Sequence, residues 1–269
     1  MQLHQFKDQF RQEQDVTMPV LFVGHGNPMN AIEDNEFSKT WAAEGSKLTV
    51  PKAILCVSAH WLTRGTKVNA LAKPETIHDF YGFPKELFDV QYNAAGSPEF
   101  AKETQALLAQ NKASLDMEWG LDHGCWSVLN KMFPKADIPV FQLSIDYYQK
   151  PEYHYELAKQ LKSLRKKGVL IMGSGNIVHN LSLFNWTDTA YDWAIEFDAK
   201  IKDLIEKGDH DPIIHYETLG KSALLSVPTN DHYLPLLYAL ALQEKDEAIR
   251  FFNDKTTAGS ISMRSVKIG

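Results

Sequence analysis

Short apolar runs alternate with helix-like segments along this chain, and this alternation limits the possible folds more than any other feature. Four runs are mostly apolar, are bounded by Gly, Pro or polar residues, and span residues 19–23 (PVLFV), 53–58 (AILCVS), 138–144 (IPVFQLS) and 169–172 (VLIM). Strands that are apolar on both faces are typical of the interior of a sheet. Helices between such strands predict an α/β fold whose central sheet is covered on both faces.

The segments between and after these runs have helical signals. Ser97 can cap a helix with Pro98 at its first position, and Gly168 can end a helix over residues 151–167. Further helices are expected over residues 189–207 and 234–242, and two late strands over residues 247–252 (EAIRFF) and 261–266 (ISMRSV).

Length and composition favour one domain. The chain has 269 residues, of which 44% are hydrophobic and 23% charged, and no change in composition marks a linker. Residues 1–17 are polar and are expected to form an extension that precedes a domain over residues 18–269. No apolar run approaches the roughly 20 residues of a membrane-spanning helix, so we expect a cytoplasmic protein that has no membrane contact.

Charge and cysteine usage exclude some other classes. The formal net charge is -6, and the one basic cluster (Lys162, Arg165, Lys166, Lys167) fits a charge complement to a helix C-terminus. A nucleic-acid partner would require a basic stripe, so none is expected. Cys56 and Cys125 belong to no C-x-x-C pair and are expected to be reduced, buried thiols.

Three histidines share one topological position. His25 (in VGHGNP), His60 (in VSAHW) and His179 (in GSGNIVHN) each follow the end of a predicted strand. Ligands of open α/β sheets collect at the carboxyl ends of strands, so the three side chains are expected in one site. Each of them alone is equally compatible with a hydrogen-bonded structural histidine.

Two further histidines are candidates for the same site. His123 (in LDHGCW) is next to Asp122, which could orient its ring, and next to Gly124, where a helix could start. His232 (in PTNDHYLPLL) opens a predicted helix, and a helix N-terminus favours the neutral, metal-binding form of imidazole.

A loop rich in aromatic residues contains His78, in the segment IHDFYGFP. Such a composition is typical of an apolar cover over a planar substrate, but it is also compatible with a packed surface loop. His4, His154, His210 and His215 lie in polar or helical surroundings, and no role is predicted for them.

The clustered histidines favour a metal enzyme. Imidazole binds Zn, Fe, Ni and Cu, and a catalytic metal keeps positions open for its substrate. A site with several neutral histidines and few carboxylates retains most of the positive charge of the ion, which favours an anionic bidentate ligand such as a catecholate. The chain contains no H-E-x-x-H protease motif and no G-x-S-x-G elbow of a serine hydrolase.

Seven segments together identify a resemblance. From about Met18 to the C-terminus, the chain resembles the DOPA 4,5-dioxygenase family, a branch of the class III, protocatechuate 4,5-dioxygenase-like extradiol enzymes. The resemblance lies in the order and joint presence of seven segments, which are VGHGNPMNAI, VSAHW, IHDFYGFP, LDHG, GSGNIVHNL, PTNDHYLPLLYALA and SMRSV. The resemblance implies a single α/β domain with a central mixed sheet and one divalent metal ion, zinc or ferrous iron, at the rim of that sheet.

The resemblance also implies an activity. A catechol such as 3,4-dihydroxyphenylalanine (DOPA) would be cleaved with O2 at the 4,5 position to a muconic semialdehyde, 4,5-seco-DOPA. The alternatives are a zinc-dependent hydrolase on the same scaffold, because histidine-bound zinc activates water, and a non-catalytic metal-binding homologue.

Site residues are implied at matching positions. The metal ligands would be His25, His60 and His232, with His179 as a fourth ligand or as the catalytic base and His123 as a second active-site histidine. The substrate pocket would be lined by His78, Asp79, Phe80 and Tyr81. Better-known members of the wider class hold iron with two histidines and a carboxylate, so His232 stands where a carboxylate is expected.

Overall fold

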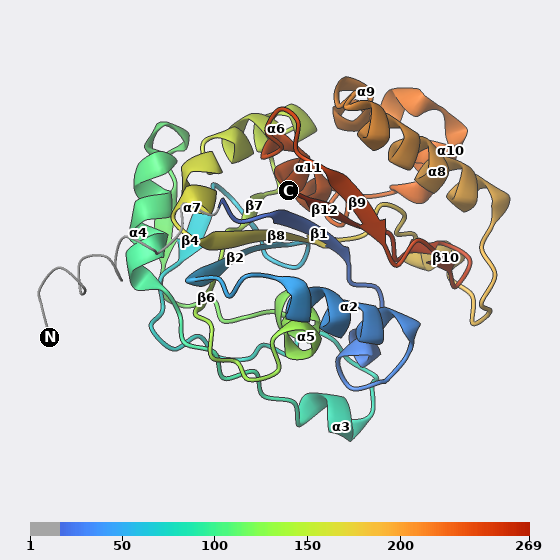
Figure 1. Cartoon of the computed structure of the whole chain (residues 1–269). Coiled ribbons are helices and arrows are strands. Elements are labelled where there is room, and N and C mark those ends of the chain that lie inside the picture. Colours follow the sequence, from blue (N-terminus) through green and yellow to red (C-terminus); the bar gives the residue numbers. More distant parts are fainter. Residues whose placement is uncertain (1–16) are drawn as a thin grey trace, which may run out of the picture.

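The computed structural model describes residues 17–269, and its centre is a six-stranded mixed sheet (Figure 1). The strand order is β6-β2-β8-β1-β12-β9. Strands β6, β2, β8 and β1 are parallel to one another, β12 is antiparallel to β1, and β9 is antiparallel to β12. The strands are β1 (Val20–Gly24), β2 (Ala53–Ser58), β6 (Val140–Gln142), β8 (Val169–Gly175), β9 (Ile249–Phe252) and β12 (Ser265–Ile268). The predicted α/β fold with a central mixed sheet is confirmed.

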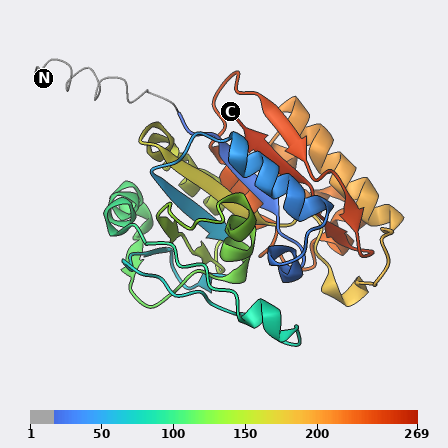
Figure 2. The same ribbon diagram turned by 60° about the horizontal axis from the view of Figure 1, so that its bottom comes forward.

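Helices cover both faces of this sheet. On one face lie α2 (Glu36–Lys47) and α5 (His123–Met132), which stand in front of the strands in Figure 2. On the other face lie α6 (Pro151–Lys159) and α11 (Leu234–Ala241). The remaining helices are α3 (Lys85–Phe88), α4 (Pro98–Leu107), α7 (Lys162–Lys166), α8 (Asp192–Lys207), α9 (Asp211–Ile214) and α10 (Lys221–Ser226), with short 3-10 turns η1 (Pro28–Ala31), η2 (Ala109–Asn111), η3 (Leu181–Leu183) and η4 (Tyr216–Leu219).

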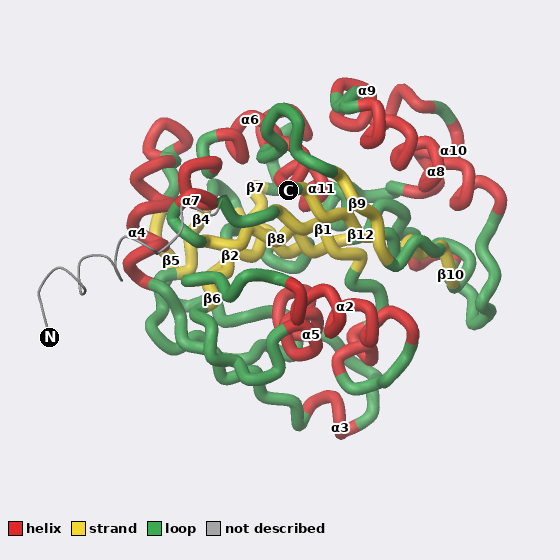
Figure 3. The backbone as a smooth tube through the Cα atoms, viewed as in Figure 1, coloured by secondary structure: helices red, strands yellow, loops and turns green. Residues whose placement is uncertain are grey.

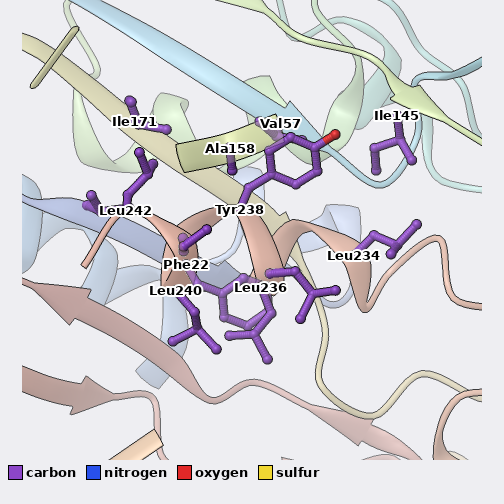
Figure 4. Packing of buried hydrophobic residues seen from close by; sticks show 14 of the residues in the cluster. Phe22, Val57, Ile145, Ala158, Ile171, Leu234, Leu236, Tyr238, Leu240 and Leu242 are labelled. Carbon is purple, nitrogen blue, oxygen red and sulfur yellow. The ribbon is translucent and has the colours of Figure 1, made fainter. Parts of the chain in front are cut away.

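Successive residues of the inner strands enter two different cores. Val20 and Phe22 of β1 pack into the core on the side of α6 and α11, whereas Leu21 and Val23 pack on the side of α2 and α5. Figure 4 shows the first of these cores, where Phe22 lies beside Leu236 and Leu240 of α11 and Tyr238 of the same helix points toward Ala158. This two-residue alternation, with both sides apolar, explains why the strands appear in the sequence as continuous apolar runs.

Six short strands pair outside the main sheet. They are β3 (Leu62–Thr63) with β7 (Ile145–Asp146), β4 (Lys67–Asn69) with β5 (Ser114–Asp116), and β10 (Thr256–Thr257) with β11 (Ile261–Ser262). A long stretch between β4 and α4, drawn mostly as loop in Figure 3, has one short helix, α3, and contains the aromatic segment around His78.

Most predicted elements are found, with shifted ends. The strand over residues 53–58 is found as predicted, the strand over residues 138–144 is shorter, and the strand over residues 169–172 continues to Gly175. The helix predicted over residues 151–167 was wrong as one element, because it is divided into α6 and α7. Residues 261–266 are likewise divided between β11 and β12.

The basic cluster contains one residue with a different role from the one predicted. Lys166 lies in the last turn of α7 as expected, but Arg165 is fully buried. Its guanidinium donates hydrogen bonds to the carbonyl oxygens of Met18 and Leu242 and pairs with Glu247. Arg165 therefore joins the start of β1 to the end of α11.

Three other expectations concern the whole chain. Cys56 and Cys125 are buried and unpaired, as predicted. Within residues 17–269 there is no helix with the length and apolar character needed to cross a membrane. The predicted polar extension over residues 1–17 lies, except for Thr17, outside the described residues, as does His4.

Candidate metal centre

The register of three parallel strands brings the first two histidines together. On one side of β8, Gly24 pairs with Gly175, and on the other side Ser58 pairs with Ser174. The chain then continues through His25, whose N–H donates to the carbonyl of Gly175, and through Ala59 to His60. Because strands β1 and β2 end level with β8, both imidazoles lie at the same edge of the sheet.

Five imidazoles form one contiguous cluster at this edge. The ring centroid of His25 lies 5.0 Å from that of His60, 5.8 Å from that of His123 and 5.2 Å from that of His232. The ring of His179 stacks on that of His232 at 3.5 Å, with 7° between the planes. The structure thus brings together all five histidines that were predicted to share one site.

Hydrogen bonds determine the tautomer of His25. The hydroxyl of Ser174 donates to the carbonyl oxygen of Gly124 at 2.5 Å, and the Oγ atom lies 3.0 Å from Nδ1 of His25. A serine hydroxyl has one proton, so Ser174 must accept a hydrogen bond from His25 Nδ1–H. The Nε2 atom of His25 therefore carries the free lone pair.

A carboxylate lies behind the next two histidines. Asp79 Oδ1 lies 3.0 Å from Nδ1 of His123, and Asp79 Oδ2 lies 3.6 Å from Nδ1 of His60. The suggestion that Asp122 orients His123 was wrong, because the buried Asp122 accepts hydrogen bonds from Ser58, Gln142 and the N–H of Cys125. Asp122 instead caps α5, which begins at His123, one residue before the start expected at Gly124.

His232 is held by its neighbour and by the sheet. Its Nδ1 atom forms a hydrogen bond with the carboxylate of Asp231, and its carbonyl oxygen accepts the N–H of Asn176, just beyond β8. His232 precedes α11 by two residues, so its ring projects from the turn before the helix. This position agrees with the prediction that it lies at the start of that helix.

Burial keeps three imidazoles of the cluster neutral, those of His25, His60 and His179. Desolvation, followed by the charges of the neighbouring histidines, lowers the pKa of His25 and of His60 well below the ordinary value. Desolvation and then the neighbouring His232 likewise lower the pKa of His179. Neutral imidazoles have a lone pair for a metal ion or for a proton.

The donor geometry fits a divalent metal ion. The Nε2 atoms of His25 and His60 lie 3.2 Å apart, and the candidate ligand atoms of His25, His60 and His123 all lie within 4.8 Å of one another. Two nitrogens bound to one tetrahedral ion at about 2.0–2.1 Å are separated by roughly 3.4 Å, close to the first of these distances. Since the Nδ1 atoms face Ser174 and Asp79, the two Nε2 atoms are the nitrogens that could bind one ion.

The histidines line a cavity of about 640 Å³. This volume is within the usual range for a small-molecule site. Aromatic side chains form much of its wall. Among the described residues that line the cavity, Asp188 is the only acidic residue, and there is no Lys or Arg. The aromatic wall residues other than histidine are Phe37, Phe80, Phe83, Phe184 and Trp186.

Comparison with known proteins identifies the family. The family described as "Catalytic LigB subunit of aromatic ring-opening dioxygenase" matches residues 17–263. The chain belongs to this LigB family. The implied kinship with class III extradiol enzymes is therefore confirmed.

Relatives and a solved structure agree with the LigB assignment. The chain is 46% identical over 258 residues to "4,5-DOPA dioxygenase extradiol" of Escherichia coli (strain K12), covering 94% of this chain and 95% of the relative. It is 35% identical to the protein of the same name from Beta vulgaris, covering 94% and 97%. The crystal structure of an uncharacterized protein, JW3007, from Escherichia coli K12 has a TM-score of 0.82 and 41% identity, and the match covers 94% of this chain and 100% of that one.

The four predicted pocket residues of this LigB member have four different positions. Phe80 lines the cavity, whereas Tyr81 is 92% exposed and lies outside the lining. His78 Nε2 lies 3.0 Å from the carbonyl oxygen of Val90, and the His78 ring packs on Phe80 and Trp126. Asp79 contacts His60 and His123 and does not line the cavity. Only Phe80 of the four is thus found in the cavity wall.

Sequence reasoning missed the opposite wall of the cavity. Two segments that meet through backbone hydrogen bonds, residues 181–188 and 257–263, contribute Trp186 and Met263 to the lining. Asp231, next to His232 in the sequence, could have been found from that adjacency. Ser174 had no comparable signal, because its partner His25 lies 149 residues away.

Proposed function

We propose that this LigB family member is an extradiol dioxygenase that cleaves a catechol such as DOPA at the 4,5 position with O2, giving the muconic semialdehyde 4,5-seco-DOPA. The observation that carries the proposal is the cluster of five histidines at the base of an aromatic-lined cavity. The names of the Escherichia coli and Beta vulgaris relatives support DOPA as the substrate. They also favour ring opening over the zinc hydrolase alternative.

The proposed ligands of the metal ion are His25, His60 and His232. The Nδ1 atoms of these rings have partners in Ser174, Asp79 and Asp231, which leaves each Nε2 atom available. Ferrous iron is the proposed active ion, because zinc has no redox chemistry and could only substitute for it. When bound, iron supplies the one-electron chemistry that allows O2 to react with a catecholate.

The proposed proton acceptor is His179. Its ring lines the cavity, and its lowered pKa keeps it neutral, so that it can take a proton from a phenolic hydroxyl of the catechol. Stacking on His232 fixes the orientation of the His179 ring beside a proposed ligand. His123, on the other side of the cluster, is the second group that can hold or return a proton during ring opening.

The cavity wall accounts for the rest of the substrate. Phe80, Phe83 and Phe184 offer apolar surface to a planar ring. Asp188, with its side chain 77% exposed, is proposed to attract the ammonium group of DOPA. A cytoplasmic location is also proposed, because the unpaired Cys56 and Cys125 suit a reducing compartment.

Aerobic incubation of the iron-loaded protein with DOPA tests this proposal. We expect oxygen uptake and a yellow ring-opened product. His179→Ala should bind metal but lose most turnover, since general acid–base catalysis typically contributes about 10²–10⁴-fold. Full turnover by His179→Ala would contradict the assigned base, and the absence of both oxygen uptake and coloured product would contradict the substrate.

A further inference from the structure

Asp79 lies between two histidines of the cluster and is not part of the cavity lining. We propose that Asp79 is a positioning residue that sets the tautomer and orientation of both His60 and His123. This inference rests on the proposed metal centre, and it gives Asp79 a different role from substrate binding.

The contacts of Asp79 use both carboxylate oxygens. Oδ1 accepts a hydrogen bond from the backbone N–H of His123 at 2.9 Å and lies 3.0 Å from the Nδ1 atom of the same residue. Oδ2 faces Nδ1 of His60 at 3.6 Å. Nδ1 of His123 is buried without a well-aligned hydrogen bond, so a nearby carboxylate favours the protonated state of that nitrogen.

The backbone before Asp79 is anchored. The N–H of Ile77 donates to the carbonyl of Leu121 at 2.7 Å, and the carbonyl of Ile77 accepts the indole N–H of Trp126 at 2.8 Å. The next residue, His78, packs against Trp126 and makes the contact with Val90. These fixed points in the loop aim the carboxylate at the histidines.

A carboxylate behind a metal-binding imidazole has a definite effect. It holds the proton on Nδ1 and leaves Nε2 free to bind. The backbone N–H of His123 donates to Oδ1 of the same carboxylate at 2.9 Å, which fixes Asp79 beside both rings. Because Phe80 follows Asp79 directly, the same loop fixes an aromatic wall residue of the cavity relative to the two imidazoles.

The test compares Asp79→Asn with Asp89→Asn. Both changes replace a carboxylate by an amide of the same size, and Asp89 is an exposed residue of the same loop region that pairs with Lys85. Zinc affinity is measured by competition with a chelator. We expect Asp79→Asn to bind zinc about 10- to 100-fold more weakly and Asp89→Asn to match the unchanged protein.

A second measurement needs no metal. Long-range ¹H–¹⁵N spectra of the metal-free protein report which nitrogen of each imidazole carries the proton. We expect His60 and His123 to be Nδ1–H in the unchanged protein and to become mixed in Asp79→Asn. An Nε2–H tautomer for both in the unchanged protein would overturn the inference, even if Asp79→Asn did not fold.

The outcomes separate this inference from the proposed function. If the unchanged protein bound no divalent metal, the proposed metal centre would fail, while the tautomers would still test Asp79. If the unchanged protein bound zinc tightly and Asp79→Asn bound it equally well with the same tautomers, the positioning role alone would be refuted.

Discussion

At the scale of single residues, the centre depends on partners that select one nitrogen of each imidazole. Nδ1 of His25 forms a hydrogen bond with Ser174 and Nδ1 of His232 with Asp231, whereas Nδ1 of His60 faces Asp79 at 3.6 Å. The strand-end pattern of the sequence was sufficient to place His25, His60 and His179 in one site. These partners, by contrast, are hydroxyl and carboxylate groups that mostly approach from distant segments, which local patterns do not reveal.

Substitution of His232 and of His123 should have different effects on metal binding. We expect His232→Ala to lose most of its affinity for zinc, because a proposed ligand is removed, and His123→Ala to retain about one equivalent of zinc but turn over slowly. Metal analysis after equilibrium dialysis measures both. The reverse pattern would make His123, whose ligand atom lies within 4.8 Å of those of His25 and His60, the third ligand.

A substitution of Asp188 should weaken the binding of catechols that carry an ammonium group. We expect Asp188→Asn to raise KM for DOPA up to about fivefold, a small effect because the carboxylate is exposed and already pairs with Lys255. KM for 4-methylcatechol, which has no ammonium group, should not change. An equal rise in KM for both catechols would show that Asp188 does not recognise the ammonium group.

At the scale of elements, the site depends on the close approach of α11 to β8. A Cβ atom on Gly175 would lie 2.1 Å from the backbone carbonyl oxygen of His232. The sequence predicted the turn after β8 but could not show this approach, because it joins segments that are far apart in the chain. The division of residues 151–167 into α6 and α7 was also hidden, since no Gly or Pro marks it.

Gly175→Ala should therefore damage both the fold and the metal site. Two backbone segments would have to separate, so we expect a loss of about 1–3 kcal/mol in the free energy of unfolding together with weaker zinc binding. Gly208→Ala is the contrast: Gly208 has a positive φ but open space around it, so it should cost about 1 kcal/mol with normal zinc affinity. Urea unfolding and chelator competition measure the two effects, and unchanged zinc affinity in Gly175→Ala would contradict the role of this contact.

At the scale of the whole molecule, both faces of the sheet are covered by apolar cores, and the described residues also include buried ionisable groups. One of these groups is His154 of α6, a fully buried residue whose Nδ1 lies 2.9 Å from the hydroxyl of Tyr238 in α11. Desolvation lowers the pKa of His154 to about 4. The sequence placed His154 correctly in a helix, but its burial depends on how α6 packs against α11.

Because His154 is buried, we expect the free energy of unfolding to fall in acid. The pKa of His154 is lower in the folded than in the unfolded protein, so the unfolded state binds more protons as the pH falls below about 6.5. Between pH 7 and pH 5 the metal-free protein should lose about 2 kcal/mol more unfolding free energy than His154→Gln. Urea titrations at the two pH values measure this difference, and equal losses would contradict it. His215→Gln, which removes an exposed histidine whose pKa is raised, should change the pH dependence in the opposite direction.

The histidine cluster is proposed to support the oxygen-dependent ring opening of a catechol. The most direct measurement is the stoichiometry of oxygen consumption by protein that has been loaded with iron anaerobically. An oxygen electrode follows the consumption of O2 with DOPA as the limiting reactant, and mass spectrometry gives the mass of the product. We expect one O2 to be consumed for each DOPA and the ring-opened product to gain both oxygen atoms. Substrate turnover without oxygen consumption, or no turnover with any catechol by protein that has bound iron, would contradict it.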